Sequence, residues 1–511
     1  MAAKSDLVIR NASIFDGSGA ASVRADIAIN GERIAAVGRG AGAGAVEIDA
    51  RGGAVAPGFI DVHSHDDFAV FATPEMDFKV MQGVTTDVVG NCGWGAAPRP
   101  QAIAMLGALH VGSRVPQWDG YAGYLDAIDR NPASLNVAVL VGHGTVRLAA
   151  MGNAKRNATE AEIGVMRAFV REGIAAGAAG FSTGLIYEPG RYAATEEVIA
   201  LTSEMRGGTA LYASHMRDEA GGLLDSVRET IRIGEEAGVA VQISHHKASG
   251  QENWGRVRES LGLIEAARAR GLDVTADQYP YTAGSTHLGA VIQNGALDDG
   301  PARGGLGKVP ADKLLFAATP KHPEWEGLTL AAFCERWNLP ARAAAERVAS
   351  EESAGAVVIV ELMDEADVRT VMRHPTTMIG SDGIPAGDKP HPRLYATFPR
   401  VLGHYARDEK VLTLAEAIYR MTGMPARKFH LADRGFVREG FFADLVIFDP
   451  ARIADTATYE DPRRYPDGLS HVIVNGTVVA RNGQHTGARP GRGLRRAQSA
   501  AAMRIASAGL D

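Results

Sequence analysis

The stretch AVAPGFIDVHSH, residues 54–65, decides the fold that we expect for this chain. An apolar run from Ala54 to Ile60 is followed by two histidines two positions apart, His63 and His65. Side chains at that spacing in an extended chain point the same way, so both imidazoles can reach one metal ion. The alternative is a pair of solvent-facing histidines in a loop. The stretch predicts a buried strand whose carboxyl end carries two metal ligands.

Seven further strand-like runs also end in side chains that can do chemistry. In a (β/α)8 barrel the carboxyl ends of the strands converge on one face, where the active site lies. Alternation of such runs with helix-like stretches up to about residue 382 therefore predicts an α/β fold with a TIM-like (β/α)8 barrel. The seven runs are Thr86–Val89 before Asn91 and Cys92, Val137–Val141 before His143, Gly180–Phe181 before Ser182, Leu211–Ala213 before His215, Val239–Ile243 before His245, Val274–Ala276 before Asp277 and Tyr279, and Met378–Gly380 before Asp382.

Both ends of the chain have a different pattern, with short β-rich runs and tight turns. Asn30-Gly31 and Asn475-Gly476 are hairpin signals, each between two such runs. We expect residues 1–57 and 430–489 to form one small β-sandwich domain beside a barrel of residues 58–429. The terminal segment, residues 490–511, shows no core pattern, and we expect it to be poorly ordered.

A long insertion interrupts the barrel pattern at about residues 285–350. It contains helix-like stretches at Leu328–Glu335 and Arg342–Ser350 and a glycine-rich segment at Asp298–Lys308. Glycine-rich segments over a barrel mouth are typical of mobile lids. We therefore expect an inserted lid segment.

Composition places the chain among ordinary globular enzymes. Its 511 residues are 46% hydrophobic and 22% charged, with a net charge of -7. The acidic balance argues against a nucleic-acid partner, and no run approaches the ~18 apolar residues of a membrane helix. With no signal-like segment and only Cys92 and Cys334 as cysteines, we expect a cytoplasmic protein without disulfides. No pattern addresses the oligomeric state.

Three more residues join the histidine pair as metal ligands. His215 and His245 each close a strand with the same Ser-His dipeptide, and Cys92 precedes a glycine that frees the backbone. Imidazole and thiolate together suit zinc. For Cys92 the alternative is a buried inert thiol.

Polar residues at the last strand ends predict the remaining chemistry. Asp382 is placed to take a proton from water polarised by a metal, although an Asx turn before Gly383 would also explain it. Arg393 can bind a carboxylate, and Tyr279, Lys247 and Ser285 can add hydrogen bonds, with loop packing as the alternative. Residues expected to support or flank the site are His246, His143 and Asn91, and possible loop contacts are His287, Gln293 and Arg303.

These motifs, in their order and context, resemble the N-acyl-D-amino-acid deacylase (D-aminoacylase) family of the amidohydrolase superfamily over roughly residues 5–485. By that resemblance, Zn2+ would bind tightly at Cys92, His215 and His245. The motifs are His63-x-His65, Cys92, His215, Ser244-His245-His246-Lys247, Tyr279-Pro280-Tyr281, Gly284-Ser285-Thr286, Ser381-Asp382-Gly383 and His391-Pro392-Arg393.

The resemblance also implies the remaining roles. His63, His65 and Asp382 would frame a second, weaker metal position, with Asp382 as the catalytic base. Arg393 and Tyr279 would receive the α-carboxylate of a small-molecule substrate, an N-acyl-D-amino acid.

Two rival functions stay open at this point. One is a cyclic-amide hydrolase of the dihydroorotase or hydantoinase type, which should lack Arg393 as a carboxylate clamp and carry a bridging lysine. The other is a non-catalytic scaffold on the same fold, against which the complete ligand set argues.

Overall fold

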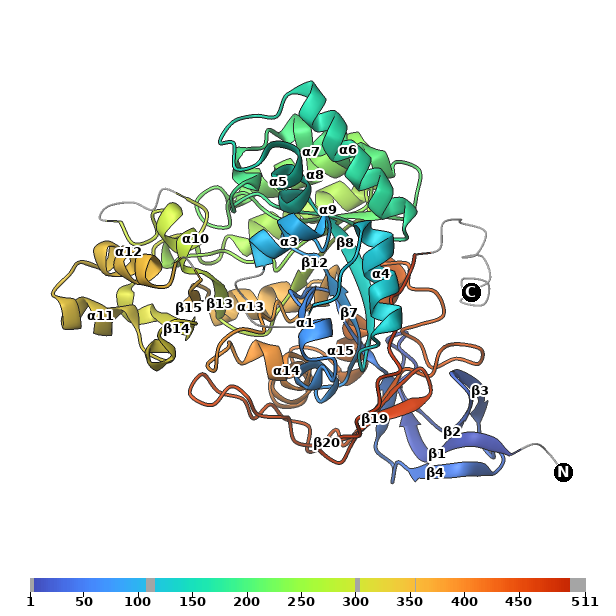
Figure 1. Cartoon of the computed structure of the whole chain (residues 1–511). Helices are drawn as coiled ribbons and strands as arrows, with labels where there is room; N and C mark the ends of the chain where they lie inside the picture. Colours follow the sequence, from blue (N-terminus) through green and yellow to red (C-terminus); the bar gives the residue numbers. More distant parts are fainter. Residues whose placement is uncertain (1–3, 107–114, 299–303, 354, 497–511) are drawn as a thin grey trace.

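The computed structural model describes residues 4–106, 115–298, 304–353 and 355–496, and a barrel of eight parallel strands lies at its centre (Figure 1). The sheet is nearly closed: β6 and β16 meet where the Asp382 amide donates to the His63 carbonyl, 2.7 Å away. All eight predicted strands are present, so the TIM-like barrel is confirmed. They are β6 (Phe59–Asp61), β7 (Val84–Val89), β8 (Asn136–Gly142), β9 (Gly180–Gly184), β10 (Leu211–His215), β11 (Val241–Ile243), β12 (Val274–Gln278) and β16 (Thr377–Ile379).

The barrel interior is packed at the end away from the polar strand ends. Ile60, Val88, Leu140, Leu211 and Met378 form one buried cluster there, which fixes the strands that carry the site. Helices surround the strands: α1 (Ala69–Ala72), α2 (Asp77–Val80), α3 (Arg99–Leu106), α4 (Gly120–Arg130), α5 (His143–Met151), α6 (Glu160–Ala175), α7 (Thr195–Thr202), α8 (Leu223–Ala237), α9 (Val257–Ala269), α13 (Glu365–Arg373), α14 (Arg393–Arg400) with a π-helical continuation (Val401–Asp408), α15 (Leu414–Met421) and α16 (Gly423–Lys428).

The inserted segment forms a unit of its own, which projects from the barrel (Figure 1). The expected helices are present as α11 (Leu330–Trp337) and α12 (Ala341–Glu351), together with α10 (Leu288–Gln293). The structure adds a three-stranded antiparallel sheet of β13 (Ala283–His287), β14 (Leu314–Ala318) and β15 (Val357–Glu361), which the sequence pattern did not predict.

The expected lid falls partly outside the described residues, at 299–303. Within the described part, Gly305 forms a β-bridge with Asp218, and the Leu306 carbonyl accepts a hydrogen bond from the Ser249 hydroxyl at 2.9 Å. These contacts attach residues 304–308 to the loops of the barrel mouth.

Strands from both ends of the chain pair in one nine-stranded sheet, which encloses a second apolar core. Asn30-Gly31 and Asn475-Gly476 form the expected turns between β2 and β3 and between β18 and β19. The strands are β1 (Ser5–Ile14), β2 (Val23–Asn30), β3 (Arg33–Gly38), β4 (Gly44–Asp49), β5 (Ala54–Pro57), β17 (Leu445–Phe448), β18 (Leu469–Val474), β19 (Thr477–Arg481) and β20 (Gln484–His485).

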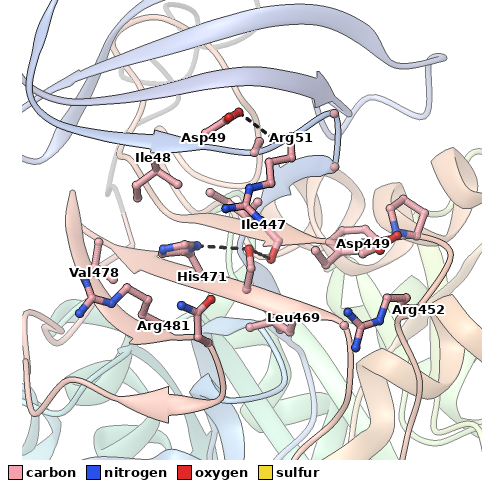
Figure 2. A pocket seen from close by; sticks show the side chains of 18 of the residues that line it. Ile48, Asp49, Arg51, Ile447, Asp449, Arg452, Leu469, His471, Val478 and Arg481 are labelled. Atoms are coloured by element: carbon pink, nitrogen blue, oxygen red, sulfur yellow. Dashed lines mark hydrogen bonds between the residues drawn. The ribbon is translucent and has the colours of Figure 1, made fainter.

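This small β domain contains a wide groove, which we call the β-domain groove. Figure 2 shows Ile48 of β4 facing Ile447 and the strands that carry His471 and Val478. The groove has a volume of about 1000 Å³. It opens where β4 pairs with β1 but not with the strands of the C-terminal half.

Residues 490–496 differ from the expected poorly ordered tail, because they lie along the barrel. The Gly491 amide donates to the Ala133 carbonyl, the Leu494 amide donates to the Val137 carbonyl, and Arg495 pairs with Asp129 at 2.8 Å. The rest of that predicted tail, 497–511, is outside the described residues. In the described part of the chain, no helix is long and apolar enough to cross a membrane.

Candidate metal-dependent active site

Three predicted ligands converge at the carboxyl ends of β7, β10 and β11. Cys92 Sγ lies 3.6 Å from His215 Nδ1 and 3.6 Å from His245 Nε2, and all three residues are buried. Tetrahedral zinc with Zn–S ~2.3 Å and Zn–N ~2.0 Å separates such a sulfur and nitrogen by about 3.5 Å. The two nitrogens are 2.7 Å apart, so a metal between them would need the rings to part slightly. The donor set therefore fits zinc in kind and nearly in spacing.

A second group shares the Cys92 thiol. His63 Nε2 lies 3.3 Å from Cys92 Sγ and 3.4 Å from Asp382 Oδ1, and His65 Nε2 lies 3.0 Å from the same carboxylate oxygen. The donor atoms of these four residues all lie within 4.8 Å of one another. The structure thus brings together all six predicted ligands in two groups that meet at Cys92.

The backbone at three of these residues has positive φ. Cys92 (55°), His245 (35°) and Asp382 (50°) lie two or three residues after the ends of β7, β11 and β16. A non-glycine residue in this conformation costs about 1–3 kcal/mol and persists only when surrounding contacts impose it. At His245 that contact is the Asp277 carboxylate, which accepts the His245 amide at 2.7 Å. The strain turns each side chain back over the barrel mouth.

The charges in the site favour the ionised forms of Cys92 and Asp382, which are the forms that bind a metal. Burial raises the pKa of the Cys92 thiol, but the nearby His63 and hydrogen bonds from His215 and His245 lower that pKa well below its usual range. Burial likewise opposes ionisation of Asp382, and Arg393 and His63 outweigh it, so the pKa of its carboxyl falls well below the usual range. A thiolate and a carboxylate therefore face the imidazoles.

Two carboxylates that the sequence analysis did not assign as supports orient the histidines. Glu219 Oε1 lies 2.9 Å from His245 Nδ1, and Asp277 Oδ1 lies 3.1 Å from His63 Nδ1. Each carboxylate can accept the proton of one ring nitrogen and so leave the other nitrogen free as a ligand. Glu219 lies in the loop after β10, four residues beyond His215, with no strand-end pattern that would have identified it.

Lys247 is tied to the same support. Its ammonium donates to Glu219 Oε1 at 2.7 Å and lies 2.8 Å from His245 Nδ1. Burial would raise the pKa of Glu219, but Lys247 and the two histidines hold that pKa below its usual value. Lys247 therefore sits at the pocket wall with its charge already balanced.

Arg393 offers free donors beside Tyr279 and Asp382. Its guanidinium is fully buried, binds Asp382 Oδ2 through Nη2 at 2.9 Å, and lies 4.2 Å above the Tyr279 ring. Its Nε and Nη1 have no partner among the described residues. Ser285 contributes its backbone carbonyl, 3.4 Å from Nη2. Buried unpaired guanidinium donors are costly unless an anion binds them, so this wall suits a carboxylate.

Two aromatic side chains, also not predicted, stand over the ligands. Trp94 packs 4.7 Å from the His65 ring, Tyr187 packs 4.7 Å from the His215 ring, and the two aromatic rings are 5.3 Å apart. The inner cavity that this pair lines together with Tyr279, Ser285 and Asp382 has a volume of about 30 Å³. The site is therefore narrow.

A buried ion network lies beneath the site and fixes the loop that carries Asp382. The Lys79 ammonium donates to Asp61 Oδ2 at 2.5 Å and to the Ser381 hydroxyl at 2.9 Å. Asp61 Oδ1 in turn accepts the Ser381 amide at 2.8 Å. The network joins β6 to the end of β16.

The side chains of the other residues singled out from the sequence make their contacts with groups other than the ligands. His143 pairs with Glu197 at 2.9 Å, His246 lies 2.8 Å from the Ser260 hydroxyl, and the Asn91 amide donates to the Val88 carbonyl at 2.9 Å. These are structural contacts. Of the three possible loop contacts, His287 and Gln293 line a neighbouring cavity, and Arg303 is outside the described residues.

Comparison with known proteins adds to this geometry. Residues 46–286 and 338–480 match the Amidohydrolase family. The chain is 43% identical to a D-aminoacylase of Alcaligenes xylosoxydans xylosoxydans over 96% of this chain and 98% of the relative. It is 40% identical to the N-acyl-D-glutamate deacylase of the same organism over 98% and 99%.

Solved structures agree. A D-aminoacylase structure matches with a TM-score of 0.87 at 40% identity, covering 96% of this chain and all of that one. The N-acyl-D-glutamate deacylase of Bordetella bronchiseptica, complexed with zinc and a phosphonate inhibitor, matches with a TM-score of 0.87 at 39% identity and the same coverage. An L-hydantoinase matches at a TM-score of 0.59 and 15% identity, which shows a shared fold alone. The chain belongs to the amidohydrolase family and, within it, to the D-aminoacylases and N-acyl-D-amino-acid deacylases.

Proposed function

We propose that this protein hydrolyses the amide bond of N-acyl-D-amino acids with the help of zinc, releasing a carboxylate and a free D-amino acid. The observation that carries the proposal is the position of Asp382, with one carboxylate oxygen 3.0 Å from His65 Nε2 and the other 2.9 Å from Arg393 Nη2. This carboxylate stands between a metal-ligand group and a carboxylate-binding wall, as amide hydrolysis of an acylated amino acid requires.

Cys92, His215 and His245 would hold the tightly bound zinc, and His63, His65 and Asp382 would frame a weaker second position. A bound zinc ion would polarise the acyl carbonyl and lower the pKa of water beside it. A free thiol as ligand suits a reducing compartment such as the cytoplasm.

Asp382 would act as the base. Its carboxylate accepts a proton from the attacking water and then gives that proton to the amine as the amide bond breaks. The lowered pKa keeps the group ionised at neutral pH, ready for the first of these transfers. Deep burial, at 7% exposure, limits competing exchange with bulk water.

Arg393 and Tyr279 would position the substrate. The Nε and Nη1 donors of Arg393, unpaired among the described residues, can form a forked pair with the α-carboxylate, and Tyr279, Ser285 and Lys247 line the adjoining inner cavity. Preference for the D-configuration is proposed from the relatives, a D-aminoacylase and deacylases of N-acyl-D-glutamate and N-acyl-D-aspartate.

The test is amine release from matched N-acetyl-D- and N-acetyl-L-amino acids by the purified protein with zinc. We expect hydrolysis of D-substrates alone, abolished in Asp382→Ala and kept in Asp388→Ala, since the Asp388 side chain is 79% exposed. Equal rates on both enantiomers, or no hydrolysis by protein with zinc bound, would contradict the proposal.

A further inference from the structure

A second cavity adjoins the inner cavity on the far side of Trp94 and Tyr187. We call it the outer cavity; it has a volume of about 310 Å³, against about 30 Å³ for the inner one. The residues that matter here are Trp94, Met105, Leu148, Tyr187, His287 and Ala290. Trp94 and Tyr187 line both cavities and so form their common wall.

β13 leads from one cavity to the other. At Ser285 it contacts Arg393, at Thr286 its hydroxyl lies 3.1 Å from the Tyr187 hydroxyl, and at His287 its side chain packs 5.1 Å from Trp94. A substrate anchored by Arg393 and lying along this strand would therefore have its far end at the aromatic pair.

The chemistry of the substrate identifies that far end. The α-carboxylate and the amide nitrogen both belong to the amino-acid half, whereas the acyl chain continues from the carbonyl carbon in the opposite direction. With the carboxylate at Arg393 and the carbonyl above the metal ligands, the acyl chain points toward Trp94 and Tyr187. We propose that the outer cavity binds the acyl chain and favours uncharged chains longer than acetyl; the proposal rests on the proposed function.

The lining of the outer cavity agrees with an uncharged chain. Among its described lining residues the one acidic side chain is Glu188, which is already engaged by Lys155 at 3.1 Å and by the Tyr192 hydroxyl at 2.5 Å. Met105, Leu148 and Ala290 supply apolar surface. Burying one methylene is worth about a fourfold gain in binding. The inner cavity has little room for a chain beyond acetyl, so this gain depends on the outer one.

The experiment compares N-acetyl, N-butanoyl and N-hexanoyl derivatives of whichever D-amino acid the acetyl panel shows to be hydrolysed best. We expect kcat/KM to rise by about threefold to fourfold per methylene, the gain that apolar burial supplies. In Leu148→Trp, which fills the outer cavity, the hexanoyl-to-acetyl ratio should fall to about one. Leu148→Phe is a milder second variant.

Ile103→Trp is the matched control, because Ile103 lies on α3, as Met105 does, but is 38% exposed and outside the outer cavity. It should keep the wild-type ratio. A flat chain-length series from an enzyme active on acetyl substrates overturns the acyl assignment but leaves the proposed function. If Leu148→Trp instead changes discrimination among D-side chains and not among acyl chains, the outer cavity holds the side chain and the proposal is wrong. Failure on every acetyl substrate would count against the proposed function itself.

Discussion

The β-domain groove and the barrel mouth are opposite kinds of hollow. The groove is the larger, at about 1000 Å³, and carries Arg51, Arg452 and Arg481, which are exposed and make no ion pair with any described residue (Figure 2). The inner cavity of the mouth is about 30 Å³. Among the described residues, His65 Nδ1 at its lining and Nε and Nη1 of Arg393, which contacts the lining residues Asp382 and Tyr279, are buried without partners.

The difference shows that size is a poor guide to chemistry in this fold. An exposed arginine is satisfied by water at little cost, whereas a buried unpaired polar atom costs about 1–3 kcal/mol. The mouth also holds backbone strain at the buried residues Cys92, His245 and Asp382. Among the described residues that line the groove, the non-glycine residues with positive φ are Arg51 and Asn482, which are both exposed turn residues. The free-energy costs of unpaired polar atoms and backbone strain are concentrated in the mouth, and a bound ligand would offset them.

Removing the shared ligand should produce the largest effect. In Cys92→Ser, zinc bound per chain should fall toward zero and kcat by about 10³-fold or more, because both ligand groups use this sulfur. Metal analysis measures the zinc content, and amine release measures kcat. Cys334→Ser is the control, since Cys334 lies on α11 away from both ligand groups. Full zinc content in Cys92→Ser would remove the thiol from the site.

Asp382→Asn should have the second-largest effect, and it distinguishes a role of Asp382 in proton transfer from a role in metal binding. The amide cannot accept a proton, so kcat should fall by about 10²–10³-fold while the tight site still binds zinc. Steady-state kinetics with metal analysis on the same sample tests this. If zinc and activity were lost to the same extent, the main role of Asp382 would be that of a metal ligand and not that of a base.

Glu219→Gln should weaken zinc binding by about 10–100-fold, because the ring proton of His245 loses its carboxylate acceptor and Lys247 loses its counter-charge. Competition with a chromogenic chelator measures the affinity. Glu236→Gln, the same change on the exposed face of α8, should leave it unchanged. If both variants bind zinc like the wild type, Glu219 does not orient His245.

Strand ends explain why most of the site was predictable and Glu219 was not. Cys92, His215, His245 and Asp382 each close a buried strand, and barrel geometry carries any such residue to the mouth. Glu219 lies in a loop whose path depends on contacts distant in sequence, among them the hydrogen bond from its amide to Gly305 of the insertion.

The inserted sheet was missed for a related reason. β13 and β15 pair across about 70 intervening residues (β13 Ala283–His287, β15 Val357–Glu361), and no local turn signal marks so long a separation. Trp94 and Tyr187 follow β7 and β9 by five and three residues, but an aromatic side chain in such a loop is no metal ligand, and only the assembled mouth places their rings over His65 and His215.

The smallest expected effect is at the groove. Arg481→Ala removes an exposed guanidinium that pairs with no described residue, so kcat/KM and zinc content should match the wild type. The free energy of unfolding should change by less than about 0.5 kcal/mol, as for most surface substitutions. Urea unfolding and amine release test both points. A fall in kcat/KM without a change in stability would mean that the groove communicates with the mouth. The contrast between the two regions would then no longer hold, because exposed arginines beside a large hollow would have a role that burial and unpaired donors do not reveal.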